Sequence, residues 1–116
     1  MAVRVKTINV EYDFPTLDEA RRRVIAEIRE SKKRGFRVLK VIHGYGSTGK
    51  GGKLCVGLRK SFGLRRKEGV IRDYVAGEDF GIFNEVTLRL LEEVPEVRGD
   101  ADFGRVNEGV TLVWLK

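Results

Sequence analysis

A strand, an amphipathic helix and a second strand follow one another over residues 3–42, and this order constrains the fold most. The first run, VRVKTINV over residues 3–10, places valines among β-branched neighbours, as in a strand with one buried face. The second run, over residues 36–42, is apolar at most positions, as in a strand covered on most of its surface. Because such connections are right-handed, the sequence predicts a parallel βαβ unit.

The helix between these strands has a clear start and end. Thr16 and Glu19 match a capping box, in which the Thr16 hydroxyl accepts from the Glu19 amide and the Glu19 carboxylate reaches back to the Thr16 amide. Gly35 ends the helix. The apolar residues of this helix recur at spacings of three and four, at Leu17, Ala20, Val24, Ile25 and Ile28.

Four further elements are expected along the chain. A second helix is predicted from about residue 53 to 67, although Gly57 and Gly63 each cost about 1 kcal/mol relative to alanine. A short strand over 70–76 ends at Gly77, and a helix over 82–94 ends at Pro95. After a turn-rich stretch, the last strand spans 110–115. This order predicts one α/β layer pair.

Composition limits the classes of protein and partner. The 116 residues, of which 41% are hydrophobic, suit a single domain over residues 1–116. No stretch approaches the roughly 18 apolar residues of a membrane span, and the N-terminus lacks a signal-peptide core, so we expect no membrane association and a cytoplasmic location. A formal net charge of +6 favours polyanionic partners through phosphate neutralisation.

The glycine-rich stretch HGYGSTGKGG, residues 43–52, resembles a nucleotide-binding loop at first sight. Gly44, Gly49 and Lys50 satisfy the GxxxxGK pattern between a strand and a helix. The next position is Gly51, which has no hydroxyl for the magnesium ion that bridges the terminal phosphates. Nucleotide hydrolysis is therefore rejected. Binding of a single phosphate group by the loop amides with Lys50 or Lys53 stays open.

When the same stretch is aligned on His43, it matches another sequence signature. Residues 41–46, VIHGYG, fit the I-H-G-x-G motif that ends the second strand of the Smr (small MutS-related) domain, and GVTLV over 109–113 resembles the last strand of that family. Residues 16–20 lie where the family starts its first helix. The resemblance implies a two-layer α/β sandwich with a βαβαββ core and an inserted helix near residues 82–94, within the segment 77–107. It also implies DNA or RNA binding, with nicking endonuclease activity in some members.

The chain departs from the family at the end of the first strand. An L-D-x-H motif followed by glycine is usual there, and this sequence has Glu11 for the aspartate, Asp13 for the histidine and Phe14 for the glycine. A mechanism that needs both family histidines therefore cannot be carried over unchanged. The catalytic candidates are His43 as acid or base, Lys50 for charge stabilisation, and Glu11 and Asp13 as oxygen ligands if a divalent metal ion takes part. The metal site itself is unknown.

The loop and the second helix supply the candidates for nucleic-acid contacts. Tyr45 could stack on an unpaired base, and basic clusters on the second helix are expected to line a groove whose floor holds His43. The full set is Gly44, Tyr45, Gly46, Lys53, Arg59, Lys60, Arg65, Arg66 and Lys67. Two alternatives remain: a non-catalytic module that binds RNA, DNA or a ribosome, and a binder of a small phosphate ligand. The altered first-strand motif favours binding over cutting. DNA or RNA as the target and the oligomeric state stay undecided.

Overall fold

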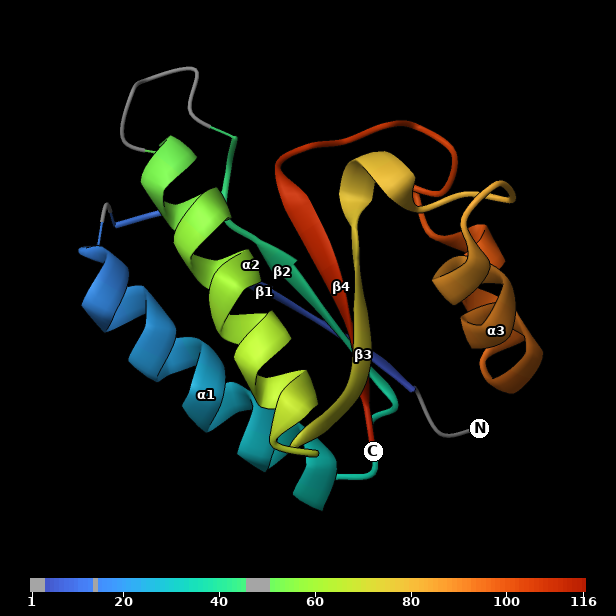
Figure 1. The fold of residues 1–116 in the computed structure, drawn as a ribbon, viewed down its shortest axis with the longest axis horizontal. Coiled ribbons are helices and arrows are strands. Elements are labelled where there is room, and N and C mark those ends of the chain that lie inside the picture. Colours follow the sequence, from blue (N-terminus) through green and yellow to red (C-terminus); the bar gives the residue numbers. More distant parts are fainter. Residues whose placement is uncertain (1–3, 14, 46–50) are drawn as a thin grey trace.

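A four-stranded sheet lies at the centre of the computed structural model, which describes residues 4–13, 15–45 and 51–116 (Figure 1). The strands are β1 (Val5–Asn9), β2 (Val38–Ile42), β3 (Ile71–Ala76) and β4 (Val110–Leu115), in the spatial order β1-β2-β4-β3. β1 pairs with β2 in parallel, which confirms the predicted βαβ unit. β4 lies antiparallel to both β2 and β3, and every one of its residues is buried.

Two helices of equal length cover one face of the sheet, α1 (Leu17–Lys33) and α2 (Gly51–Lys67). The predicted cap of α1 is present, because the Thr16 hydroxyl accepts from the Glu19 amide at 3.1 Å. The Glu19 carboxylate bonds the Thr16 hydroxyl, at 3.2 Å, instead of the backbone amide expected from the sequence. Gly35 follows the helix with φ +83°, a conformation in which glycine avoids the penalty of a side chain.

The core under these helices joins both of them to the central strands. Val24 and Ile28 of α1 and Leu58 and Phe62 of α2 pack on side chains from the sheet, namely Leu39, Val41, Ile71, Val113 and Leu115. The two helices approach closely at Gly57, where an added Cβ would lie 2.4 Å from a methyl group of Leu17. The glycine that lowers the helix propensity of α2 therefore permits the packing of α1 against α2.

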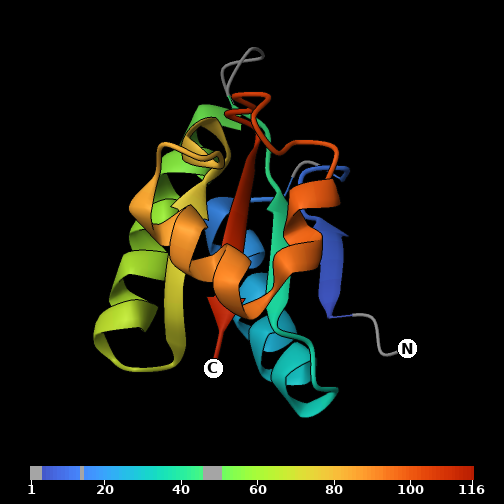
Figure 2. The same ribbon diagram turned by 90° about the vertical axis from the view of Figure 1, so that its right-hand side faces the viewer.

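The chain after β3 covers the opposite face of the sheet, as Figure 2 shows. It forms the 3₁₀ helix η1 (Gly77–Asp79), the helix α3 (Glu85–Glu93) and the 3₁₀ helix η2 (Pro95–Gly99). A second core lies here, built from Val38, Val75, Phe80, Leu90, Leu91, Val94, Val97, Val110, Leu112 and Trp114. The helix expected near residues 82–94 thus adds a layer to the two-layer core. It starts three residues later than predicted, because the Asn84 side chain caps it by accepting from the Thr87 amide.

Two buried ion pairs that share one lysine fix this second layer. Lys40 of β2 is 7% exposed, and its ammonium group lies 2.8 Å from Asp100 and 2.5 Å from Asp102. Both carboxylates belong to the turn-rich stretch between η2 and β4. The two ion pairs therefore anchor this stretch to the middle of β2. Within the described ranges, no helix combines the length and apolar character needed to cross a membrane; the cytoplasmic location stays a prediction.

Candidate functional site

Four segments of the chain meet at one edge of the sheet. β3 runs in the same direction as β1 and β2, while β4 runs in the opposite direction, so three strand ends and the start of β4 lie together. Glu11 follows β1, His43 follows β2 and Glu78 follows β3. Thr111 is the second residue of β4. We call this the His43 edge.

The His43 imidazole is fully buried, at 0% exposure, and both of its nitrogens have partners. Nδ1 lies 2.6 Å from the Gly44 carbonyl oxygen, and Nε2 lies 2.8 Å from the Thr111 hydroxyl. Arg59 Nε donates to the same hydroxyl at 3.0 Å. A carbonyl oxygen only accepts, so Nδ1 of His43 carries a proton and donates it to the Gly44 carbonyl. In the neutral ring Nε2 is then an acceptor, and the Thr111 hydroxyl donates to it while it accepts from Arg59.

Charge near the ring supports the neutral form. Burial lowers the pKa of His43, the hydrogen bond to the Gly44 carbonyl raises it, and the nearby Arg59 charge lowers it again, for a net decrease. Arg59 itself bonds both carboxylate oxygens of Glu78, at 2.8 and 2.7 Å, and donates to the carbonyl oxygen of Val110 at 3.1 Å. His43, Thr111, Arg59 and Glu78 thus form one hydrogen-bonded chain that joins the end of β2 to β4, α2 and η1.

The two first-strand carboxylates have different surroundings. Glu11 lies against the histidine loop, since a Cβ added to Gly44 would lie 2.1 Å from a Glu11 carboxylate oxygen, and Gly44 has φ +77°. Asp13 instead makes two 2.8 Å hydrogen bonds to Arg23 of α1, which lower the pKa of its carboxyl group. Glu11 therefore reaches the His43 edge, whereas Asp13 is held by α1. In the part of the chain that the structure describes, no three His, Cys, Asp or Glu side chains form a group suited to a metal ion.

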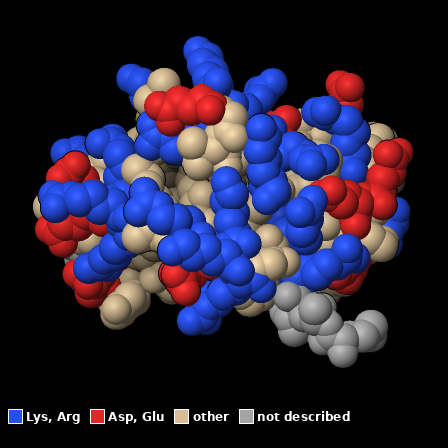
Figure 3. Space-filling view, turned by 90° about the horizontal axis from the view of Figure 1, so that it is seen from below, with Lys and Arg blue, Asp and Glu red and all other residues tan. Residues whose placement is uncertain are grey.

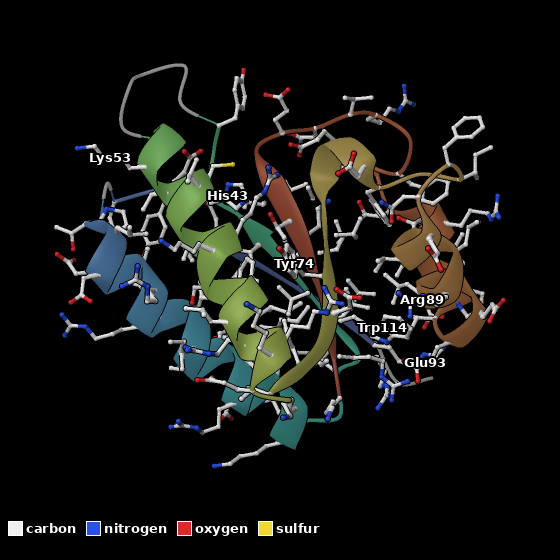
Figure 4. All side chains as sticks on the ribbon, in the orientation of Figure 1. His43, Lys53, Tyr74, Arg89, Glu93 and Trp114 are labelled. Carbon is white, nitrogen blue, oxygen red and sulfur yellow. The ribbon has the colours of Figure 1, made fainter. Side chains whose placement is uncertain are left out.

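The surface of the His43 edge is formed by other residues. Tyr45 is 58% exposed and lines an open hollow of about 420 Å³ together with Arg105, Asn107 and Glu108. Lys53 projects from the first turn of α2, away from the sheet (Figure 4). Gly46 and Lys50, two further candidates, lie outside the described residues.

The basic residues of α2 divide into two groups. The arginines face carboxylates: Arg59 pairs with Glu78, Arg65 lies 2.7 Å from Glu68, and Arg66 lies 3.7 Å from Asp73. The lysines at positions 53, 60 and 67 are exposed, and no carboxylate of the described residues lies within ion-pair distance of them. The lysines, and not the arginines, therefore present the uncompensated charge of this helix.

The expected groove with His43 at its floor does not form as predicted. His43 is buried, and Arg65, Arg66 and Lys67 lie at the far end of α2, about 18 Å from Lys53 by helical rise. There Arg65 lines the same hollow as Lys32 and Lys33, the last residues of α1. Figure 3 shows that this lower face of the molecule is largely covered by Lys and Arg side chains. Positive charge is thus found at both ends of α2.

Two members of the hydrogen-bonded chain, Thr111 and Glu78, were not singled out by sequence reasoning. Thr111 lies in the GVTLV stretch that resembles the last strand of a known family, and this was the available signal. Glu78 gave none, because its partner Arg59 is 19 residues away in another element. Their proximity follows from the sheet order, which places β4 between β2 and β3.

Comparisons with known proteins place these features in context. A family model described as the Smr domain matches residues 14–116. The crystal structure of the Smr domain of Thermus thermophilus MutS2 superimposes with a TM-score of 0.59 at 20% sequence identity, and the match covers 96% of this chain and 98% of that one. At this identity the likeness concerns the fold. Comparison with curated proteins gives no match.

Proposed function

Because the chain belongs to the Smr domain family, we propose that it is a nucleic-acid-binding domain whose His43 edge holds DNA or RNA without cutting it. The family comprises nucleic-acid-binding and nuclease-like domains. The proposal assigns this chain to the binding kind, with residues 1–116 acting as one domain.

The burial of His43 carries this proposal. A general acid or base must reach the proton that it transfers, within about 3 Å or through one water. Both nitrogens of His43 are instead bonded inside the protein, to Gly44 and Thr111. Asp13, which replaces the second family histidine, is occupied by Arg23. Two of the catalytic candidates, His43 and Asp13, are thus engaged within the fold.

The same edge offers contacts suited to binding. Tyr45 exposes its ring beside the loop, where it can stack on an unpaired base with a contribution of about 1–3 kcal/mol. Lys53 can contact a phosphate group, and among the side chains that the structure describes at this edge none forms a pattern for reading bases. We therefore expect recognition of the backbone and of shape, with little sequence preference.

Fluorescence anisotropy with labelled single- and double-stranded DNA and RNA, at low salt and with or without divalent metal ions, tests the proposal. We expect binding to at least one substrate, and electrophoresis of the same samples should show intact strands. The absence of binding to all four substrates would refute it. Cleavage by the wild type that is lost in a folded His43→Ala variant would support the nuclease alternative, with Glu11 and Lys50 as the remaining candidates.

The binder of a small phosphate ligand remains the second alternative. It depends on the loop amides with Lys50 or Lys53, and thus on far fewer contacts than a polymer makes. Inorganic phosphate or a mononucleotide that displaces the oligonucleotide at micromolar concentration would favour it.

A further inference from the structure

Three lysines on α2 form a straight ridge along the outside of the molecule. Lys53, Lys60 and Lys67 are seven residues apart, and seven residues complete nearly two full helical turns, so the three side chains leave the helix in almost the same direction. All three are exposed. The ridge extends about 21 Å, from the His43 edge to the C-terminal end of α2.

The residues between the lysines keep this ridge open. Val56 and Leu64 occupy the same side of α2 and are 70% and 48% exposed, respectively. Gly63 also lies on this side, and nothing closer than the Tyr74 hydroxyl, at 3.6 Å, would meet a Cβ there. The buried positions of α2, such as Leu58 and Phe62, are on the opposite side. No core packing explains the pattern of the ridge.

The charge of the ridge is not compensated by its surroundings. α2 contains six basic residues and no acidic one. Its three arginines meet Glu78, Glu68 and Asp73, whereas the three lysines have no such partner among the described side chains. Lys53 lies in the first turn, where the helix dipole disfavours a cation. Helix stability therefore gives no reason for Lys53.

We propose that the Lys53–Lys60–Lys67 ridge is the surface that contacts the sugar–phosphate backbone of a nucleic acid. The proposal rests on the proposed function and extends it from the His43 edge along all of α2. A linear row of evenly spaced cations matches a linear polyanion, whose charges lie about 3.4 Å apart along each strand of a duplex. The ridge spans about six such steps. Exposed Val56 and Leu64 can contact the sugars between phosphates.

The number of released counterions tests this assignment. Replacing all three lysines by alanine should reduce the slope of log K against log salt by about 2.7 on duplex DNA, or about 2.1 on a single strand. Affinity at 50 mM salt should fall at least about tenfold. The matched control replaces Arg72, Arg89 and Arg98, three exposed cations on the face of the sheet that α3 and η2 cover, by alanine and changes the net charge equally. We expect the control to retain the wild-type slope within about one unit.

The outcomes separate the ridge from the function on which it rests. If the wild type binds no oligonucleotide at 50 mM salt, the proposed function fails. If the wild type binds and the ridge variant keeps the wild-type slope, only the ridge assignment fails. An equal loss of slope in the control variant would also overturn the ridge assignment, because the net charge of the protein would then explain binding. Equal competition by polyglutamate at the same charge concentration would overturn the assignment to nucleic acid. Circular dichroism checks that both variants are folded.

Discussion

His43 acts as a structural connection between strands. Its ring joins the Gly44 carbonyl to the Thr111 hydroxyl, and Arg59 extends the connection to Glu78. Burial of a polar group lowers the stability of the fold little when each donor and acceptor has a partner. It lowers the stability much more when one partner is removed. The histidine of the signature is thus explained by what it holds in place.

The titration of His43 predicts how stability depends on pH. Because burial lowers the pKa of His43 in the folded protein, the unfolded chain binds more protons as the pH falls through about 6.5. The free energy of unfolding should therefore decrease with falling pH, by at most about 1.4 kcal/mol per pH unit. The chain has one histidine, so no second imidazole obscures the effect. Urea denaturation between about pH 7.5 and 5.5 measures it.

A His43→Gln variant is the control for this prediction. Glutamine does not titrate, so the free energy of unfolding of the variant should change less over the same pH interval than that of the wild type, whatever its absolute stability. If the free energy of unfolding depended on pH in the same way in the two proteins, the pKa of His43 would be unchanged by folding, and the prediction would be wrong.

At the scale of elements, α2 combines two roles on its two sides. One side packs on the sheet and on α1, and the other carries the lysine ridge. Gly57 and Gly63 mark this difference: a Cβ at Gly57 would overlap the Leu17 side chain, whereas a Cβ at Gly63 would make only an ordinary van der Waals contact, 3.6 Å from the Tyr74 hydroxyl. Both glycines lower helix propensity equally, so substitutions at the two positions isolate the packing effect.

Alanine at these two positions should therefore have opposite effects. Gly63→Ala should raise the free energy of unfolding by about 0.5–1 kcal/mol. Gly57→Ala should not stabilise the protein in this way. Its free energy of unfolding should be about 1–3 kcal/mol lower than that of Gly63→Ala, because the Leu17 side chain must move. Chemical denaturation measures both. The difference should shrink in a Leu17→Ala background, and equal stabilisation by both substitutions would refute the close approach of α1 and α2.

Local sequence patterns predicted the helices and strands themselves better than they predicted the environment in which each one lies. The Thr16 cap, the Gly35 stop and the apolar periodicity located α1 because these signals act within one or two turns of chain. The start of α3 was placed too early, because Ile82 continues its apolar spacing although it is half exposed and precedes the Asn84 cap. A register shift between Ile71 and Asp73 also has no local signal.

At the scale of the whole molecule, the placement of β4 determines the site. Its insertion between β2 and β3 brings Thr111 to His43, and Thr111 in turn meets Arg59, which bonds Glu78. The sequence predicts each of these elements and the parallel βαβ unit, but not the position of β4 between β2 and β3. The resemblance located His43 and the loop, whereas the exposed ridge could be separated from the paired arginines only when the positions of Glu68, Asp73 and Glu78 were known.

The central claim is that the outer surface of α2 and the exposed side of the His43 edge bind nucleic acid. Titration of the ¹⁵N-labelled protein with an unlabelled oligonucleotide, followed by amide chemical shifts, tests it most directly. The account predicts saturable shifts at Tyr45 and along residues 53–67, with little change in α3 and η2 on the opposite face. Shifts concentrated in α3 and η2, or no shifts at saturating oligonucleotide and low salt, would contradict it.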